Sequence, residues 1–254
     1  MTRLSRPARV LLLGPPGSGK GTQTERLLKR FAIPGISSGD ILRRNIKDGT
    51  DIGLAASSII SQGKLLPDNL MTKVVASELH RRRWLSPSTS WLLDGFPRTQ
   101  TQANMLDEKE LEPANAGLNF VVELRVPEDV MVERIANRLV HVPSGRVYNL
   151  TYNPPKVPGR DDITGEPLTR RPDDDPQVFR KRIKEYRAST EPLLEYYSKT
   201  TTNVLWSVAG ETSDAIFERL ETEVVRRFGE KADDDDAGVV AAADARSEAA
   251  GAAN

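Results

Sequence analysis

The sequence contains no cysteine, no excess of charge of either sign and no long apolar run. Its 254 residues include 36 Lys and Arg against 36 Asp and Glu. The absence of cysteine excludes disulfides and thiolate metal sites and fits a reducing compartment. Balanced charge argues against general nucleic-acid binding, so any attraction for anions has to come from local clusters. Because no apolar run approaches the length that spans a bilayer, we expect no membrane contact.

A glycine-rich stretch near the N-terminus organises the chain. It reads Gly14-Pro-Pro-Gly-Ser-Gly-Lys-Gly-Thr22, after the apolar run Val10–Leu13 and before a helical pattern over 23–31. A strand, a glycine-rich turn and a helix are the context of a P-loop, whose backbone N–H groups point at phosphate oxygens. The helix adds the positive end of its dipole, and Lys20 is placed to reach the outer phosphates. The pattern predicts a nucleoside triphosphate site, although Gly21 replaces the usual Ser or Thr.

A second short strand pattern, Trp91–Leu93, ends on Asp94 and continues as Gly-Phe-Pro-Arg98. A strand that ends in Asp beside a P-loop strand aims its carboxylate at Mg²⁺ or at the waters of Mg²⁺. Ligands of open α/β sheets collect at the carboxyl ends of strands, so we expect Asp94 to share an edge with the P-loop. A buried Asp that only caps its own loop is the alternative.

The remaining patterns predict an α/β fold with two insertions. Residues 37–66 contain short helical pieces punctuated by glycines, which predicts a compact helical insertion. From about 139 to 176, Pro, Gly, Asp, Asn and Arg dominate, which predicts a small β-rich insertion over the site. Between and after the insertions we expect helices at about 68–83, 128–138, 177–188, 190–198 and 213–228, and strands at 120–124 and 203–208.

The two ends of the chain have distinct compositions. Residues 1–9 carry three arginines, and no acidic residue precedes Glu25, which resembles a mitochondrial import signal. A frayed basic start without such a role is the alternative. The other end contains Asp233–Asp236 followed by an Ala- and Gly-rich segment with almost no large apolar residue. This composition predicts that residues 232–254 are disordered.

Six motifs, in order along residues 9–230, resemble the adenylate kinase family. The Gly21-Thr22 departure from the general P-loop is this family's own form. The resemblance implies a P-loop NTPase-type parallel-sheet core over 1–36, 67–136 and 175–231, an NMP-binding domain over 37–66 and a lid over 137–174. The motifs are Gly14–Thr22, Ser37–Arg43, Leu92–Arg98, Ser144–Tyr148, Asn153–Lys156 and Asp161–Glu166.

The resemblance also implies a reaction and a triphosphate site. Adenylate kinases transfer a phosphoryl group reversibly between a nucleoside triphosphate, bound with Mg²⁺, and AMP. By matched position, Asp94 would hold Mg²⁺ through water, and the backbone near Thr212 would read the base. The residues implied for the triphosphate are Gly17, Ser18, Gly19, Lys20, Gly21, Thr22, Arg134, Arg138, Val147, Tyr148 and Thr212.

A second set of matched positions would bind AMP. Within it, Arg171 and Arg182 would bridge the two phosphate chains, and Asp173 and Asp174 would position arginines as the lid closes. The residues implied for AMP are Ser38, Arg43, Lys64, Leu65, Leu66, Gly95, Phe96, Pro97, Arg98, Gln102, Arg171 and Arg182.

The catalytic residues implied are all cationic. Phosphoryl transfer requires positioning and charge stabilisation rather than covalent chemistry. Arginine suits this task because its planar fork pairs bidentately with phosphate oxygens. Closure of a lid would exclude water and protect the phosphoryl group from hydrolysis. The catalytic set is Lys20, Arg98, Arg138, Arg171 and Arg182.

The lid positions that carry zinc ligands in metal-bearing bacterial relatives are not cysteines here. The equivalent spacing is His141-x2-Ser144 followed by Asp161-x2-Thr164. Two hydroxyls and a carboxylate make a poor zinc site but a reasonable hydrogen-bonded network. The sequence therefore predicts a lid without zinc.

Within the family, three stretches look most like the GTP:AMP phosphotransferase branch of the mitochondrial matrix: Ser37–Asp40, Trp91–Asp94 and Gly145–Asn149. An ATP:AMP kinase of the cytosol or intermembrane space is the alternative within the family. A P-loop nucleotide switch is the alternative from another class, but the Asn-Lys-x-Asp motif that reads guanine is absent. The family implies a monomer that binds small nucleotides, and turnover with AMP would separate these alternatives.

Overall fold

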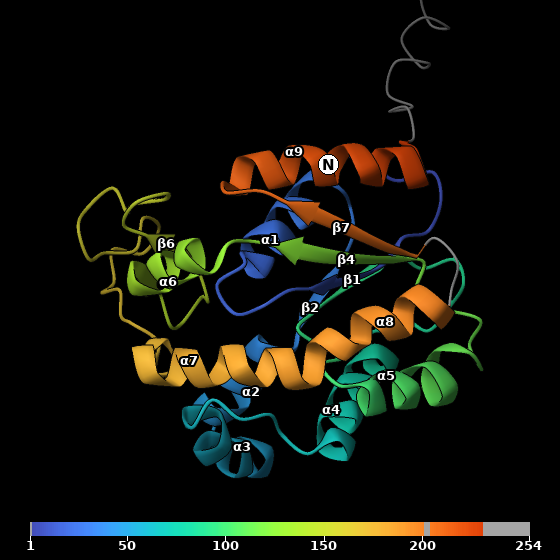
Figure 1. Cartoon of the computed structure of the whole chain (residues 1–254), viewed down its shortest axis with the longest axis horizontal. Helices are drawn as coiled ribbons and strands as arrows, with labels where there is room; N and C mark the ends of the chain where they lie inside the picture. Colours follow the sequence, from blue (N-terminus) through green and yellow to red (C-terminus); the bar gives the residue numbers. More distant parts are fainter. Residues whose placement is uncertain (1, 201–203, 231–254) are drawn as a thin grey trace, which may run out of the picture.

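Five parallel strands form the central sheet of the computed structural model, which describes residues 2–200 and 204–230 (Figure 1). The sheet confirms the predicted α/β class with a parallel core. Nearly continuous apolar runs such as Val10–Leu13 form its inner strands because both faces are covered. In spatial order the strands are β2 (Gly35–Ser37), β3 (Trp91–Asp94), β1 (Arg9–Leu13), β4 (Phe120–Arg125) and β7 (Leu205–Ala209).

The strand register determines what meets at the carboxyl edge of the sheet. Leu12 of β1 lies opposite Asp94 of β3, and Ser37 of β2 lies opposite Asp94 from the other side. The glycine-rich loop leaves β1 just beyond Leu12. Asp94, the loop and the start of the helical insertion therefore share one edge, as the sequence predicts.

Helices cover both faces of the sheet. Val10 and Leu12 face one apolar cluster, which includes residues of α1 (Lys20–Arg30) and α9 (Ser213–Phe228). Leu11 and Leu13 face the other, larger cluster. In Figure 1, α9 lies above the sheet and α8 below it. Helices that contribute to the larger cluster include α4 (Asp68–Arg81), α5 (Gln100–Leu106) and α8 (Glu191–Thr200).

Three helical segments differ from the sequence prediction. Helix α7 (Pro176–Glu185) continues through a π-helical turn, Tyr186–Thr190, directly into α8, so the two predicted helices are one continuous run. Helix α6 (Glu128–Ala136) ends two residues earlier than expected, and Arg138 begins a strand instead. Helix α5 and the π turn after it, Asp107–Leu111, were not predicted because this stretch has no clear apolar periodicity.

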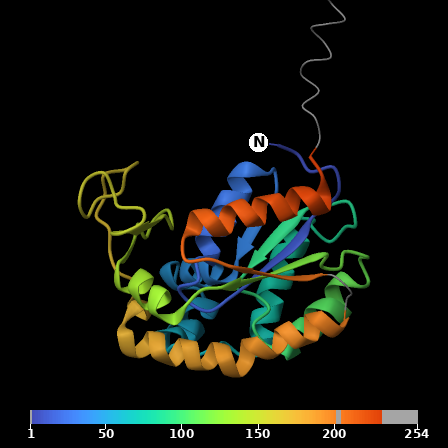
Figure 2. The ribbon, with the colours of Figure 1, turned by 45° about the horizontal axis from the view of Figure 1, so that its top comes forward.

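The two insertions have different structures. The first contains α2 (Ser38–Lys47) and α3 (Asp51–Ser61), which pack against each other. The second contains the antiparallel pair β5 (Arg138–Val140) and β6 (Val147–Asn149). Its other residues form turns, bends and isolated β-bridges, such as Val140 with Thr169 and Arg160 with Pro167. In Figures 1 and 2 it projects from the body of the molecule beside α6.

The basic N-terminal residues are attached to the core. The backbone of Thr2 donates to Arg30 at the end of α1, and Ser5 and Arg6 donate to Gly229 and Phe228 at the end of α9. Residues 2–6 are therefore not frayed. The expected disordered tail, 232–254, lies outside the described residues. Among residues 2–200 and 204–230, no helix is both long and apolar enough to cross a membrane.

Candidate active site

The glycine-rich loop turns sharply because two of its glycines adopt left-handed backbone angles. Gly17 has a φ of 83° and Gly19, the N-cap of α1, has a φ of 93°. A Cβ atom on Gly17 would lie 3.0 Å from the carbonyl oxygen of Met131 in α6. A side chain at Gly17 is thus excluded by both strain and space. The N-terminal end of α1 consequently opens directly onto the loop.

Lys20 lies in the first turn of α1 and reaches back over the loop. Its Nζ donates to the carbonyl oxygens of Gly14 at 2.5 Å and Pro15 at 3.0 Å. Burial lowers the pKa of Lys20 to about 7, although the carboxylate of Asp94 acts in the opposite direction. An anion beside Nζ would restore the charged form. Lys20 is therefore poised to gain from a bound phosphate.

Other residues of the loop provide space and unpaired hydrogen-bonding groups that an anion could use. The Ser18 hydroxyl is buried and lacks a hydrogen-bond partner among the described residues. A Cβ atom built on Gly21 would meet nothing within 4 Å. Thr22 is half-buried on the same helical turn. These features fit a loop that closes around a ligand rather than around its own side chains.

Arg134 connects the loop to the segment before α9. Its guanidinium donates to the carbonyl oxygens of Ser18 at 3.2 Å and Glu211 at 2.6 Å, and burial lowers its pKa. Thr212 caps α9 by accepting a hydrogen bond from the Ala215 N–H at 3.2 Å. The structure thus brings together the predicted triphosphate residues of three distant segments.

Asp94 ends β3 beside Lys20 and is 8% exposed. Burial raises the pKa of its carboxyl group, while the positive charges of Lys20 and Arg98 oppose that rise. A carboxylate oxygen is a hard ligand of the type that Mg²⁺ binds directly or through its waters. The chemistry of this position fits the metal that the family uses with its nucleotide.

The loop after Asp94 is held by a chain of hydrogen bonds. The carbonyl oxygen of Gly95 accepts from the Ser38 hydroxyl at 2.6 Å and from Nε of Arg98 at 2.6 Å. The backbone N–H of Arg98 donates to Gln102 at 2.8 Å, and Gln102 donates to Asp68 at 2.8 Å. Ser38, Arg98 and Gln102, all predicted for AMP, are therefore brought together. Phe96 is buried, and it and Pro97 form a cis peptide bond within this loop.

The other predicted AMP residues differ in their burial and in their contacts. Leu66 is 4% exposed and belongs to the core, whereas Lys64 is exposed and Leu65 is half-buried. Arg43 forms an ion pair with Asp40 on its own helix. The end of this insertion lies close to α7, since a Cβ atom built on Gly63 would be only 3.1 Å from Cγ of Arg182. The insertion therefore contacts the helix that carries Arg182.

The predicted catalytic cations lie close enough to repel one another, and we call them the arginine cluster: Arg98, Arg138, Arg171 and Arg182. Burial, then the charge of Arg182, lowers the pKa of Arg98 to about 10. Burial also lowers the pKa of Arg171 to about 10, and Arg43 and Arg138 add to this effect. The pKa of Arg182 is lowered as well, chiefly by burial. Mutual repulsion of this kind is relieved by a polyanion.

Two acidic residues position members of the arginine cluster. Asp174 accepts from Arg138 at 2.9 Å, and Asp173 accepts from Arg182 at 2.6 Å. Burial would raise the pKa of Asp173, but the surrounding arginines lower it overall. No hydrogen bond from the Arg171 side chain is found among the described residues, which fits a cation that faces a ligand.

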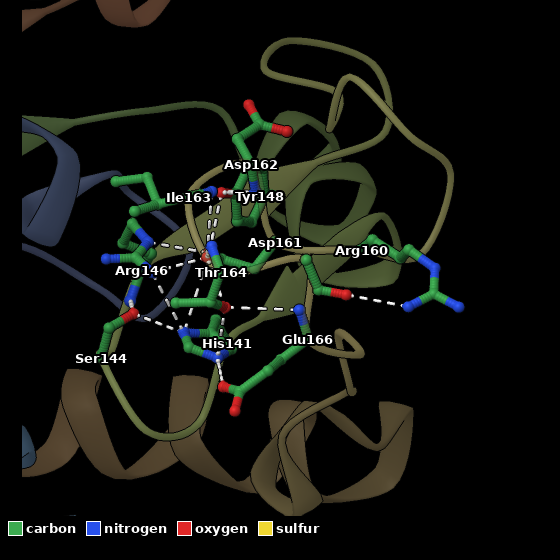
Figure 3. A network of polar contacts seen from close by, with 11 residues as sticks. His141, Ser144, Arg146, Tyr148, Arg160, Asp161, Asp162, Ile163, Thr164 and Glu166 are labelled. Atoms are coloured by element: carbon green, nitrogen blue, oxygen red, sulfur yellow. Dashed lines mark hydrogen bonds and ion pairs between the residues drawn. The ribbon is translucent and has the colours of Figure 1, made fainter.

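The predicted polar network forms in the lid segment, and Figure 3 shows it. His141 is buried and contacts Ser144 at 2.7 Å and Glu166 at 2.6 Å. The two carboxylate oxygens of Asp161 accept hydrogen bonds from Nε and Nη2 of Arg146, at 2.8 and 2.6 Å. The Thr164 hydroxyl completes the predicted quartet by donating to Asp161 at 3.0 Å.

Tyr148 belongs to this network rather than to an exposed nucleotide surface. It is 5% exposed, and its hydroxyl donates to Asp161 at 2.9 Å. Val147 is half-buried on the same strand. Contact of this pair with a nucleotide would therefore use backbone groups and not the Tyr148 hydroxyl.

Sequence reasoning missed several supporting residues. Asp68 holds Gln102 and also accepts from Thr99 at 3.0 Å, but an acidic residue after a proline is usually only a helix start. Glu166 and Arg146 complete the lid network, although exposed charged residues in a loop give no such signal. Thr190 contacts the Arg98 backbone from 92 residues away, which no local pattern indicates.

A P-loop on a five-stranded parallel sheet, with the buried guanidinium of Arg98 on the loop after β3, is the arrangement expected of a P-loop nucleoside monophosphate kinase. The sequence model of the family described as "Adenylate kinase" matches residues 12–202. This chain belongs to the adenylate kinase family.

Named relatives agree with this assignment. A Saccharomyces cerevisiae protein named "GTP:AMP phosphotransferase, mitochondrial" is 57% identical over 230 residues, covering 90% of this chain and 97% of the relative. A second, from strain S288c and with the same name, is 59% identical over 218 residues, covering 85% of this chain and 96% of its own length. The "Adenylate kinase" of Photorhabdus laumondii is 44% identical over 191 residues, covering 75% of this chain and 86% of its own.

Proposed function

We propose that this kinase transfers the terminal phosphoryl group of GTP, or of ITP, to AMP, giving GDP or IDP and ADP. The similarity to two yeast proteins that are named GTP:AMP phosphotransferases, over 90% and 85% of this chain, carries the proposal. The bacterial relative at 44% identity is named simply adenylate kinase. ATP is therefore the alternative donor.

The triphosphate would bind over the glycine-rich loop. Gly17 to Thr22 would supply backbone N–H groups, and Lys20 would place its ammonium on the outer phosphates. Arg134 and the backbone near Thr212 would border the base and sugar, since Arg134 already bridges Ser18 and Glu211. Backbone of the Val147-Tyr148 pair would reach the nucleotide from the lid.

AMP would bind between the helical insertion and the loop after β3. Ser38, Arg43, the 64–66 stretch and the 95–98 loop would surround it, with Gln102 as a hydrogen-bonding partner. Arg98 would contact its phosphate, and Arg138, Arg171 and Arg182 would bridge the two phosphate chains. The lowered pKa values of Arg98 and Arg171, both about 10, support this proposal. A polyanion would offset both the desolvation of these buried cations and their repulsion by neighbouring arginines.

Mg²⁺ would accompany the triphosphate, with Asp94 holding its waters. When bound, the metal supplies positive charge to the phosphate oxygens of the donor. The protein's own residues orient the two nucleotides, exclude water and spread the remaining charge. The donor set of the lid, with two hydroxyls, one imidazole and the Asp161 carboxylate already engaged by Arg146, does not favour zinc. Stoichiometric zinc in the purified protein would contradict this part of the proposal.

The domain roles follow the same assignment. Residues 37–66 would act as the NMP-binding domain, and 137–174 would act as the lid that closes over the donor. The names of the yeast relatives support a mitochondrial location, and we propose the matrix as the compartment, with the protein acting as a monomer. Fractionation of the tagged full-length chain and its mass in solution would test these two points.

The preferred phosphoryl donor distinguishes a GTP:AMP kinase from an ATP:AMP kinase. Phosphoryl transfer to AMP is measured with GTP, ITP and ATP as donors, each with Mg²⁺ and each over a range of concentrations. Preference for GTP and ITP in kcat/KM is the expected result. A preference for ATP would place the enzyme with the general ATP:AMP kinases. Hydrolysis of the donor without transfer to AMP would contradict the kinase assignment and favour a nucleotide switch.

A further inference from the structure

The carbonyl oxygen of Arg98 receives a hydrogen bond from a helix that is remote in sequence. The Thr190 hydroxyl donates to it at 2.9 Å, across 92 positions of the chain. Thr190 is 5% exposed, so this hydroxyl is removed from water and its hydrogen bond is formed inside the protein. Losing the donor would leave a buried carbonyl oxygen without this partner.

Thr190 occupies an unusual backbone position. It is the last residue of the π turn Tyr186–Thr190, in which the N–H of Glu191 donates to the carbonyl oxygen of Tyr186. A π turn inserts one extra residue into a helix and is frequent at functional sites. Figure 1 shows α7 and α8 as one long run below the sheet, with α5 beside α8.

The π turn joins two helical segments that pack differently. Phe179 and Ile183 of α7 pack with Met131 and Ile135 of α6, in a small cluster. Residues of α8, such as Leu193, belong to the large core cluster instead. Thr190 stands between these segments and is attached to the 95–98 loop.

The same helical run carries Arg182, which is paired with Asp173. Burial is the main cause of the lowered pKa of Arg98, and the positive charge of Arg182 lowers it further, so the two guanidinium groups repel each other. Two like charges stay close only where the backbones that carry them are fixed. The Thr190 hydrogen bond fixes the backbone of Arg98 to the run that carries Arg182.

We propose that Thr190 is a positioning residue that sets the orientation of Arg98 toward the AMP phosphate through this hydrogen bond to the Arg98 carbonyl oxygen. The inference rests on the proposed role of Arg98 in AMP binding. Thr190 acts through Arg98 and does not touch the nucleotide. Its loss should affect AMP and the transfer step more than the triphosphate.

The test compares Thr190→Val with Thr190→Ser in the full chain. Valine keeps the shape and removes the donor, whereas serine keeps the donor. For Thr190→Val we expect about a fivefold to tenfold rise in KM for AMP, the effect of one lost hydrogen bond, with a fall in kcat and an unchanged KM for the triphosphate. Thr190→Ser should stay within about twofold of the wild type.

Ser189→Ala is the matched control. Ser189 lies in the same π turn, but its hydroxyl donates to Glu185 one turn earlier at 2.7 Å and not to the 95–98 loop. This variant should leave all kinetic constants within about twofold. A lower melting temperature of Thr190→Val with unchanged KM for AMP and unchanged kcat would reduce Thr190 to a packing residue and overturn the proposal.

Two measurements keep the inference testable if Thr190→Val does not fold. In an Arg98→Ala background, residue 98 keeps the carbonyl oxygen that Thr190 bonds but lacks the guanidinium that this bond would orient. Thr190→Ser and Thr190→Ala should therefore have equal AMP affinity by calorimetry in that background, and a persisting difference would contradict the proposal. In a crystal structure of the wild type with AMP, the Thr190–Arg98 hydrogen bond should persist. Wild-type transfer to AMP tests the proposed function separately, since it does not depend on Thr190.

Discussion

Arginines of the lid network and of the arginine cluster differ in their pairing. Arg146 in the lid forms an ion pair, whereas Arg98 and Arg171 in the cluster form none among the described residues. In the lid, Asp161 and Arg146 satisfy each other, and these hydrogen bonds hold the pKa of Asp161 well below its usual range. In the arginine cluster, burial and mutual repulsion lower the pKa of Arg98 and Arg171 instead. Paired charges stabilise the segment that contains them, whereas Arg98 and Arg171, which form no ion pair among the described residues, are available for an external anion.

Removal of a single cation from the arginine cluster should have the largest effect. Arg171→Ala should lower kcat by about 10³–10⁵, the range found for arginines that stabilise a transferring phosphoryl group. Its stability should not fall, because Arg171 is partly buried beside other cations. Steady-state kinetics and thermal unfolding measure the two effects. Arg170→Ala, one residue earlier and exposed, is the control. A loss below about tenfold would place Arg171 outside the reaction centre.

A substitution in the lid network should affect the local stability of the lid more than the rate of phosphoryl transfer. Asp161→Asn removes the charge that accepts from Arg146, Tyr148 and Thr164. Amides of the lid should exchange with deuterium roughly tenfold faster, while kcat falls far less than in Arg171→Ala. Asp162→Asn, an exposed neighbour, provides the comparison. Unchanged exchange would mean that the network does not hold the lid together.

The stability contributions of the lid network and of the glycine-rich loop should depend on pH in different ranges. The folded pKa of Asp161 lies below the unfolded value of about 4, so its contribution is complete above pH 4 and is lost as the pH falls below that value. The folded pKa of Lys20, about 7, lies below its unfolded value of about 10.4. The free protein should therefore gain stability from this group as the pH rises from about 7 toward 10.

Binding of a triphosphate should reverse the pKa shift of Lys20. At pH 8 the Lys20 side chain is mostly neutral in the free protein, so binding of the Mg²⁺–triphosphate complex should take up as much as about one proton. Calorimetry in two buffers of different ionisation enthalpy measures this uptake. Lys20→Met should abolish it. An equal uptake in Lys20→Met would assign the proton to another group.

The smallest effect is expected at the C-terminus. Deletion of residues 232–254 should change neither kcat nor the melting temperature measurably, because the segment has almost no large apolar residues that could pack against the enzyme. A chain that ends at 231 is assayed beside the full chain. A clear loss of stability or activity would show that the acidic segment at 233–236 contacts the enzyme.

Predictability from the sequence differed between these regions for physical reasons. The glycine-rich loop and Asp94 were predictable because phosphate binding requires particular residues at short spacing, and the apolar strands place both at one edge. The lid quartet was predictable from the family resemblance, which matches its positions to zinc ligands of relatives. The contacts that Arg146 and Glu166 make with it were not predictable, since turns bring these residues in. Helix α9 was predicted with its observed bounds because its apolar period is unbroken.

Long-range contacts were beyond such reasoning. A π turn and a break between two helices have the same effect on apolar periodicity. The sequence therefore predicted a break at Ser189, where the structure has the π turn Tyr186–Thr190. The end of α6 was misplaced because Arg138 pairs with Asn149 in a strand, a tertiary contact that overrides local helix propensity. The burial of Tyr148 also depends on Asp161, 13 residues away.

The open space above Gly21 offers a way to separate binding from folding by protein engineering. Glycine inside a helix is less favourable than alanine by up to about 1 kcal/mol, and a Cβ at Gly21 would meet nothing within 4 Å. Gly21→Ala should thus fold at least as well as the wild type. Its methyl group would enter open space beside the loop. Weaker triphosphate binding at unchanged stability would show that a bound phosphate approaches the backbone at this position.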